Sequence, residues 1–579
     1  MKFPLTTLII GLIIPVIIEA QSSNNTVITY NVVNLLNATE SMAVKVDNVD
    51  YPMSLNGVNN TQILYSGEAP AAQKAYRYVR VFNNNQTAEP FDRPPVTTNT
   101  VNEFFNRTWN IYNVSQLPIV FDPLPAIHRL HTDLHKSGQI PTIHLIGNQT
   151  DLDQMHKNST ADLTVVGNIS YVNLNQTLFY DGAEISLSGR SSRWFPKLSY
   201  NVKLQKKDRL FHNRRIKLRA LDTDPSYIRE QLAYTIVNNT GLASSEFSYI
   251  RVFMNNKELG LFGIIEPFQN PWLANTFNNG DTDYNNGYLY QGVFQTAASA
   301  AQNQTSDLSY INNVSAYGLG QYKIKEEAKK GSKVNWQPLM DLTKFIATAP
   351  TNTSDAVSQW NQHLDMDSVL RSMALEVLLG YSDGYSTMVD NYYVYQNLQT
   401  NKFFWIPSDM DLTLGSTMFN ISDMWSGDYK TFPGFEKRPL TTQMLKVPQF
   451  QQTYNELLVN LTNALINPAK TNDFINDITG MITEDVAWDK TLPRVGSDIM
   501  SSLMSGLDNG NDTSSVLKDI VGEGMPSGID LATAENFGKR INASISFLTA
   551  VNGPTGYISL SGVKEWFTTI HQNVTKFYS

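Results

Sequence analysis

The chain of 579 residues contains no cysteine and only 8 histidines. The missing thiols exclude disulfides, cysteine-ligated zinc, iron–sulfur clusters and thiol nucleophiles. Because covalent cross-links are impossible, stability must come from buried apolar surface. With 41% hydrophobic residues over this length, the chain can form two or three domains, each with its own core.

After the N-terminal segment, the chain has no long apolar run. No later stretch reaches the roughly 18 consecutive apolar residues that a membrane span needs. At the start, Lys2 precedes an apolar run from Leu8 to Ile18, and the small residue Ala20 follows. This pattern predicts a signal peptide at residues 1–20, with an uncleaved anchor as the alternative. The C-terminus HQNVTKFYS has no hydrophobic tail, so no GPI-anchor signal is seen.

Many N-x-S/T sequons accompany the predicted signal peptide. Some arise by chance in so Asn-rich a chain, and which of them carry glycans stays open. Together with the signal peptide they predict a glycoprotein that enters the secretory pathway. Examples of these sequons start at Asn37, Asn106, Asn168, Asn313, Asn420 and Asn573.

Positive charge is in deficit, with 44 Lys and Arg against 53 Asp and Glu and a net charge of −9. This balance argues against nucleic acid as a partner. The motif H-E-x-x-H is absent, so a zinc-protease function has no support.

Four segments follow the predicted signal peptide. Residues 21–140 contain alternating strand-like runs and predict a small β-rich accessory domain. Residues 141–270 contain closely spaced strand candidates and one helix candidate with clear start and stop signals. Residues 271–335 are rich in Asn, Gly and Ser, which predicts a mobile insertion. Helical apolar spacing dominates residues 336–579. The overall pattern predicts an α+β protein.

The most informative stretch runs from 380 to 415 and places acidic residues around a strand pair. Asp383 and Asp390 precede a strand-like YYVY run, and Asp409 and Asp411 directly follow a second run that ends at Pro407. Strands paired in a hairpin bring their outer ends together. We therefore expect these carboxylates to converge with an amide, as a site for a divalent cation and a phosphoryl acceptor requires.

Each of these acidic residues also has a purely structural interpretation. Asp383 either accepts the proton of a hydroxyl or caps its own turn. Asp409 and Asp411 either ligate Mg²⁺ or Mn²⁺, or form a turn that binds calcium or no ion. Asn391 is either a site ligand or a residue that begins a strand.

Four motifs in order resemble the CotH kinase family. They are GRSSRWFPKLSYNVKL, DPSYIREQLAYTI, NNKELGLFGIIEPF and GYSDGYSTMVDNYYVYQ followed by FFWIPSDMD. The resemblance covers roughly residues 140–480, and the signal peptide and sequons are similar to those of fungal, Mucorales-type members, which are surface proteins implicated in host-cell invasion. It implies a two-lobed atypical protein-kinase-like fold, with a β-rich N-lobe at 141–270 and a helical C-lobe at 336–579, preceded by the small β-rich domain.

The resemblance also implies ATP as a substrate, Mg²⁺ or Mn²⁺ as a cofactor, and Ser or Thr of exported proteins as acceptors. Asp383 matches the family's catalytic Asp, and Asn391 matches the Asn before the YY pair. Asp409 and Asp411 match the metal-binding acids. The implied nucleotide-binding residues are Lys197, Lys203 and Glu266, with the choice between the two lysines left open.

The chain departs from known patterns in two ways. The family's Trp before the first metal-binding Asp is Ser408 here. Asn391 follows Asp383 after eight residues, a longer interval than in the H-R-D-x-x-x-x-N loop of ordinary kinases. Glu230, on the predicted helix, could pair with the phosphate-binding lysine, and the SLSGRSS turn at 186–192 could cover phosphates. A surface pair and a plain hairpin turn are the alternatives.

Three functions remain compatible with the sequence. The first is an exported kinase that modifies secreted, spore-wall or cell-wall proteins. The second is a cell-surface or spore-wall invasin that binds host receptors and uses the fold as a scaffold. The third is a pseudokinase that binds nucleotide without turnover.

Overall fold

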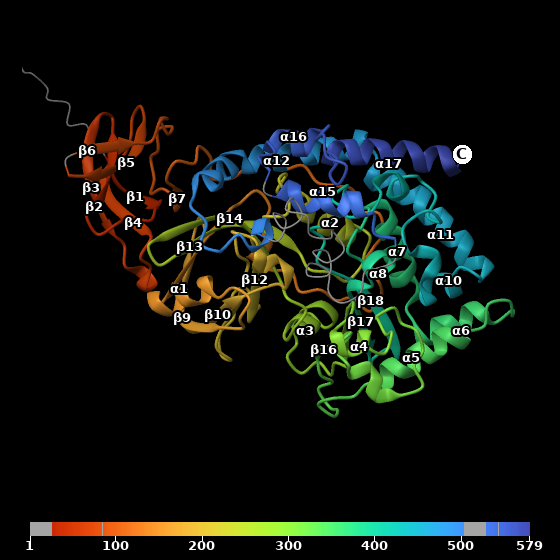
Figure 1. The fold of residues 1–579 in the computed structure, drawn as a ribbon. Helices are drawn as coiled ribbons and strands as arrows, with labels where there is room; N and C mark the ends of the chain where they lie inside the picture. The colour runs from red at the N-terminus through yellow and green to blue at the C-terminus, as the bar shows by residue number, and fades with distance from the viewer. Residues whose placement is uncertain (1–25, 84, 503–527, 542, 579) are drawn as a thin grey trace, which may run out of the picture. The chain divides into compact units, whose positions relative to one another are not determined.

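The computed structural model describes residues 26–83, 85–502, 528–541 and 543–578 (Figure 1). The predicted signal peptide lies outside the described residues. The chain divides into two compact units. The smaller holds the described residues up to Asn34 together with 38–56 and 64–108, and the larger holds 35–37, 57–63 and everything from Trp109 onward.

The smaller unit is a seven-stranded sheet whose interior contains a buried network of polar side chains. The Tyr76 and Tyr78 hydroxyls donate to Glu103 at 2.8 and 2.7 Å, and Arg93 pairs with the same carboxylate at 3.1 Å. Because each buried polar group has a partner, burial here carries little penalty. In sheet order the strands are β6 (Asn85–Ala88), β5 (Tyr76–Phe82), β2 (Glu40–Val46), β3 (Val49–Leu55), β4 (Leu64–Pro70), β1 (Val27–Val33) and β7 (Glu103–Phe104).

The compact unit ends at Thr108, whereas the sequence-based division lay at residue 140. Residues 109–140 are part of the larger unit because their apolar side chains, among them Leu117 and Leu124, are buried in its main core. The amides of Val120 and Phe121 also donate to the Asn239 carbonyl.

A closed seven-stranded barrel forms the first part of the larger unit. Nearly every residue of β13 and β14 is buried, which matches their largely apolar sequence, and the tight turn between them places Asn255 at φ 47°. Parallel pairing of β8 with β13 closes the barrel. In order the strands are β10 (Thr177–Leu187), β11 (Tyr200–Lys203), β12 (Arg215–Arg219), β14 (Lys257–Ile265), β13 (Phe247–Met254), β8 (Thr142–Gly147) and β9 (Thr164–Val172).

A second sheet of the larger unit combines the predicted acidic hairpin with the segment expected to be a mobile insertion. The structure differs from that expectation, because residues 271–335 contribute two paired strands and two helices. The pairing buries Leu289 and Tyr290, so the apolar residues of GYLYQGVF are explained by a sheet rather than a loop. The sheet order is β16 (Tyr322–Glu326), β15 (Leu289–Val293), β17 (Asp390–Asn397) and β18 (Lys402–Pro407).

Helices are the other main regular elements of the described residues, so the protein is α+β, as predicted. No helix in the described ranges has the length and apolar character needed to span a membrane. The helices are α1 (Gln149–Lys157), α2 (Arg229–Asn239), α3 (Trp272–Phe277), α4 (Ala297–Ala300), α5 (Gln337–Thr348), α6 (Ala356–His363), α7 (Met366–Leu378), α8 (Tyr385–Met388), α9 (Ile421–Met424), α10 (Pro439–Met444), α11 (Pro448–Leu461), α12 (Pro468–Thr491), α15 (Leu531–Ile541), α16 (Phe547–Asn552) and α17 (Val563–Tyr578).

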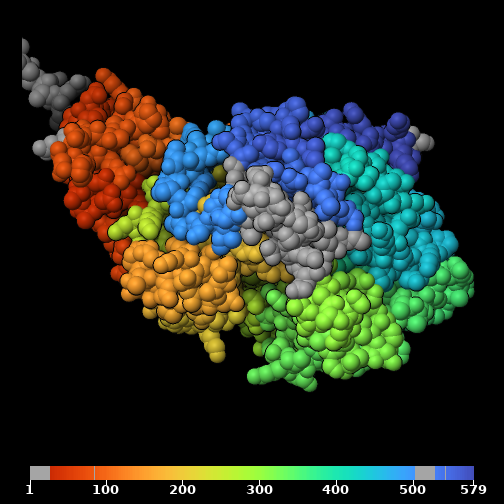
Figure 2. Space-filling view, viewed as in Figure 1, coloured from red at the N-terminus to blue at the C-terminus, as the bar shows by residue number. Residues whose placement is uncertain are grey.

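Helix α12 is attached to the barrel by buried charges near its C-terminal end. Lys197 lies 2.7 Å from Asp489, which also accepts hydrogen bonds from the Leu261 amide and the Tyr227 hydroxyl at 3.0 and 2.8 Å. The chain just beyond the helix, coloured light blue, continues along the orange barrel (Figure 2), and the Gly496 amide donates to the Pro196 carbonyl.

We expect the Lys197→Met substitution to destabilise the protein by about 1–3 kcal/mol, because the buried Asp489 carboxylate loses its lysine and keeps only Arg494 as a cation partner. Chemical denaturation measures the change. Lys203→Met is the matched control, since the Lys203–Glu184 pair is largely exposed and such pairs contribute at most about 1 kcal/mol. Equal losses in the two variants would contradict the prediction.

Candidate active site

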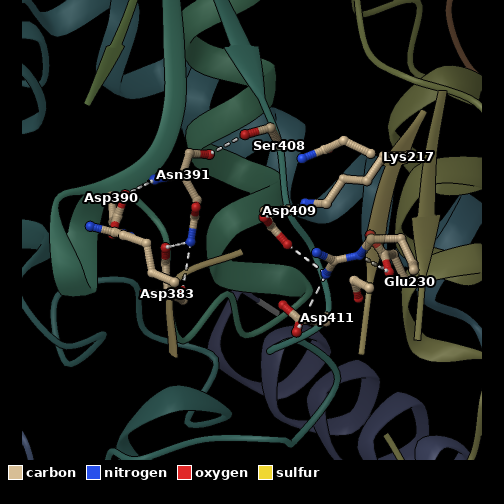
Figure 3. A network of polar contacts seen from close by, with 12 residues as sticks. Lys217, Glu230, Asp383, Asp390, Asn391, Ser408, Asp409 and Asp411 are labelled. Atoms are coloured by element: carbon tan, nitrogen blue, oxygen red, sulfur yellow. Dashed lines mark hydrogen bonds and ion pairs between the residues drawn. The ribbon is translucent and has the colours of Figure 1, made fainter. Parts of the chain in front are cut away.

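A cleft of about 840 Å³ lies between the outer face of β10–β12 and the β15–β18 sheet. Its lining includes the four predicted site residues that carry the acid and amide chemistry. Figure 3 shows them in two neighbouring groups, one around Asp383 and Asn391 and the other around Asp409 and Asp411. The hairpin therefore brings together the residues that the sequence analysis expected to converge.

In the loop from Asp383 to Asn391, the side-chain amide of Asn391 orients the carboxylate of Asp383. Asn391 Nδ2 donates to Asp383 Oδ2 at 2.6 Å and to the Asp383 carbonyl at 3.1 Å. The short helix α8 occupies the loop between them, which explains how residues eight positions apart can meet. Glu376 of helix α7 stabilises the loop, since its carboxylate accepts hydrogen bonds from the backbone amides of Tyr385 and Ser386 at 3.0 and 2.9 Å.

Burial raises the pKa of Asp383 well above its ordinary value, and the nearby carboxylates of Asp390 and Asp411 raise it further. A carboxyl group with a raised pKa holds a proton more readily near neutral pH than an ordinary aspartate. This property suits a group that accepts a proton from a hydroxyl during a reaction.

Three residues of the site have left-handed backbone conformations that side chains other than glycine rarely adopt. Val389, Asn391 and Asp409 have φ values of 51°, 53° and 56°. Such conformations cost of the order of 1–3 kcal/mol each and are most unfavourable for a β-branched residue such as Val389. They persist because the surrounding hydrogen bonds hold the loops, and strain of this kind is concentrated at functional sites.

Ser408, at the position of the family's Trp, connects the two groups. Its amide and its hydroxyl both donate to the Asn391 carbonyl, at 3.1 and 3.0 Å. The Tyr381 hydroxyl donates to the Asp409 carbonyl at 2.9 Å. The Ser408 departure therefore adds a hydrogen bond between the loops while leaving every acidic side chain in place.

Asp409 and Asp411 face basic residues of the barrel strand β12. Asp409 lies 2.5 Å from Arg219 and 3.3 Å from Lys217, and Asp411 lies 3.4 Å from Arg219. Burial opposes ionisation of Asp409, but the two cations outweigh it and hold its pKa below the ordinary value. Burial dominates at Asp411 and raises its pKa, although the Thr223 hydroxyl donates to it at 3.1 Å.

Arg219 also pairs with Glu230 of helix α2 at 3.0 Å, and both side chains are buried. Burial raises the pKa of Glu230 to about 7, against the opposing effect of Arg219. The sequence left Glu230 open between a partner of the phosphate-binding lysine and a surface pair, whereas in the structure it is buried and pairs with Arg219. The alternation in RRIKLRAL was the available signal, because Arg215, Lys217 and Arg219 share one face of β12.

Neither of the two lysines named by the resemblance forms an ion pair with Asp409 or Asp411. Lys197 is buried against Asp489 and donates to the Leu261 carbonyl at 2.6 Å, and it is not part of the cleft lining. Lys203 lines the cleft but is paired with Glu184 at 2.8 Å. Lys217 and Arg219, not these lysines, extend toward the acidic residues.

Glu266 lines the opposite part of the cleft, at the end of β14. Its carboxylate is bound by Arg129, and it also accepts from the Glu246 amide at 3.3 Å. The side chain is therefore engaged within the protein. The residues that follow it, Pro267, Phe268 and Gln269, line the cleft beside the Tyr393 ring.

The donor set fits a hard divalent cation, because it consists of carboxylate and amide oxygens. Within the described ranges, no three acidic or histidine side chains form a ready-made cation cage. Mg²⁺ is commonly held by one or two carboxylates together with substrate phosphates, so Asp409 and Asp411 fit such an ion only in company with a phosphate ligand.

Comparison with known proteins places this site in a family. The model of the CotH kinase protein family matches residues 185–492, more than half of the chain and a range that holds all the residues above except Arg129 and Glu184. Invasin CotH3 of Rhizopus delemar is 24% identical over 79% of this chain and 74% of its own length. Invasin CotH7 of the same fungus is 26% identical, with coverages of 74% and 69%. Inner spore coat protein H of Bacillus subtilis is 24% identical, with coverages of 57% and 84%.

We expect Arg219→Met to destabilise the protein by about 3 kcal/mol, because Glu230 and Asp409 then lose a shared buried partner. Denaturant unfolding is the measurement. The double variant Arg219→Met with Glu230→Gln should recover part of the loss, since no buried carboxylate remains unpaired at Glu230. A double variant less stable than the single one would refute the pairing.

Proposed function

Because the chain belongs to the CotH kinase protein family, we propose that it is an exported atypical protein kinase. It transfers the γ-phosphate of ATP to Ser or Thr of exported, spore-wall or cell-wall proteins, with Mg²⁺ or Mn²⁺. The observation that carries this proposal is the Asp383–Asn391 pair beside Asp409 and Asp411 in one cleft.

In this proposal the barrel with helix α2 serves as the β-rich lobe of a kinase-like fold, and the helices from α5 onward serve as the helical lobe. The buried Arg219–Glu230 pair supports this assignment, since ordinary kinases also join a cation of a strand, a lysine, to a glutamate of a helix. Lys217 and Arg219 take the phosphate-facing role first assigned to Lys197 or Lys203.

Asp383 accepts the proton of the acceptor hydroxyl while the hydroxyl oxygen attacks the γ-phosphorus. The bond from phosphorus to the β–γ bridging oxygen breaks, and ADP leaves. Asn391 keeps the Asp383 carboxylate oriented through its 2.6 Å hydrogen bond. Orientation matters because phosphoryl transfer depends on positioning more than on covalent chemistry.

Asp409 and Asp411 are the residues that would hold the divalent cation, with Asn391 as a neutral oxygen donor nearby. When bound, the cation neutralises the charge that develops on the phosphates. Asp409 is suited to this task because its depressed pKa keeps it ionised at any physiological pH.

Export and surface display are supported by the relatives, which are named as invasins and as an inner spore coat protein. The predicted signal peptide and the sequons agree with a secreted, cell-surface or spore-wall protein. The partners in this proposal are exported protein substrates, and the net charge gives no reason to expect nucleic acid.

We expect Asp383→Asn to lower the rate of phosphoryl transfer by about 10²–10⁴-fold, because the proton acceptor is lost. Incubation with labelled ATP, Mn²⁺ and an acceptor protein measures the rate, and thermal unfolding with ATP and metal measures binding. Asp383→Asn should keep nucleotide-dependent stabilisation, whereas Asp409→Asn should lose it. Stabilisation of the wild type without any transfer would make the protein a pseudokinase.

A second candidate function, adhesion to host cells, is favoured by the names of the fungal relatives. We expect a strain that lacks this protein to adhere less to host cells. Complementation with the wild type and with Asp383→Asn separates the two functions, because a scaffold needs no proton acceptor. Restoration by the wild type alone would assign the adhesion phenotype to kinase activity.

A further inference from the structure

The turn between β10 and β11 carries a residue that the proposed mechanism does not yet use. Ser188, Gly189 and Arg190 of this turn line the cleft. Gly189 has φ 88°, and a Cβ atom there would lie 1.8 Å from the Ser192 hydroxyl. The positive φ favours glycine at this position, and the next side chain, Arg190, reaches across the cleft to Asp390.

Arg190 reaches from the barrel to the loop that carries the candidate catalytic residues. Its guanidinium pairs with Asp390 and donates to the Val293 carbonyl at 3.2 Å. Asp390 in turn accepts from the amide of Asn391 at 2.8 Å. The arginine is thus one residue away from the amide that orients Asp383.

Arg190 and Asp390 differ sharply in exposure, at 60% for the arginine side chain and 6% for the aspartate. An arginine has five N–H donors, and these two contacts use two of them. Among the described residues the guanidinium has no further hydrogen-bond partner, and Arg190 lines the cleft. Asp390 raises the pKa of Arg190 most, and the carboxylates of Asp383 and Asp409 raise it further. The guanidinium charge therefore lies close enough to interact with both acidic groups of the site.

This placement addresses an electrostatic difficulty of the proposed site. A γ-phosphate positioned for attack by a hydroxyl at Asp383 would face several carboxylates of the same sign of charge, among them Asp390 and Asp411. One divalent cation at Asp409 and Asp411 leaves the side near Asp383 without positive charge. Arg190 is the cation that the described residues supply at that side.

We propose that Arg190 is a catalytic residue that donates hydrogen bonds to the γ-phosphoryl group of the nucleotide. This role rests on the proposed kinase function. Planar guanidinium groups bind phosphate oxygens through paired hydrogen bonds and stabilise the charge spread over them during transfer. The arginine exchanges no proton, and the bonds made and broken are those of the transfer itself.

The alternative is that Arg190 only holds Asp390 in place. The two roles differ in a measurable way, because a group that contacts the γ-phosphate distinguishes ATP from ADP and a group that positions a loop does not. Thermal unfolding in Mg²⁺ with ADP or with the non-hydrolysable β,γ-imido analogue of ATP therefore separates them.

We expect the wild type to be stabilised more by the ATP analogue than by ADP. Arg190→Gln should keep the shift with ADP and lose the additional shift with the analogue, and its kcat should fall by at least about 10²-fold. Arg190→Lys should recover part of both effects, because it restores the charge without the fork of donors. Lys207→Gln, which removes one positive charge from an exposed loop of the barrel, should behave as the wild type.

Asp390→Asn is the decisive comparison, since it removes the partner of Arg190 but leaves the arginine. We expect it to keep the difference between the analogue and ADP. If Asp390→Asn loses the difference between the analogue and ADP just as Arg190→Gln does, Arg190 is only a positioning residue and the assignment is overturned. Retention of the difference in Arg190→Gln would overturn it as well. A wild type that neither nucleotide stabilises would instead refute the proposed function, and this role with it.

Discussion

The buried guanidinium of Arg219 is the interaction on which the site depends. It belongs to barrel strand β12, pairs with Glu230 of helix α2, and reaches Asp409 and Asp411 beyond the end of β18. One side chain therefore joins the barrel, its helix and the acidic loop. A buried charge without a partner is costly, so the three elements are stable only when they are assembled together.

The second constraint is the hydrogen-bonded closure of the two loops. The Asn391 carbonyl accepts from Ser408, and its side chain holds Asp383, so the loop before β17 and the loop after β18 cannot move independently. This closure pays for the left-handed conformations of Asn391 and Asp409. The residue that departs from the family pattern, Ser408, is thus part of the structure that maintains the site geometry.

Much of the local structure was predictable. The helix predicted within residues 141–270 is α2, although it begins at Arg229, four residues after Pro225, and the two acid-flanked strands are β17 and β18. Closure of the barrel was not predictable, because the parallel β8–β13 pairing joins strands about 100 residues apart and leaves no local signal. Residues 271–335 were misleading for a related reason, since one of their strands, β15, pairs with β17 of a hairpin far along the chain.

The sequence by itself determined the chemistry of this protein: which acids flank the hairpin, how closely they follow its strands, and which family the motifs resemble. Only the tertiary structure decided which cations face those acids. Lys197 and Lys203 have the same residue type and a favourable spacing, yet one is buried against Asp489 and the other is paired with Glu184. Charged side chains are long and find partners from any part of the chain, so their roles follow from the folded arrangement and not from their position in a motif.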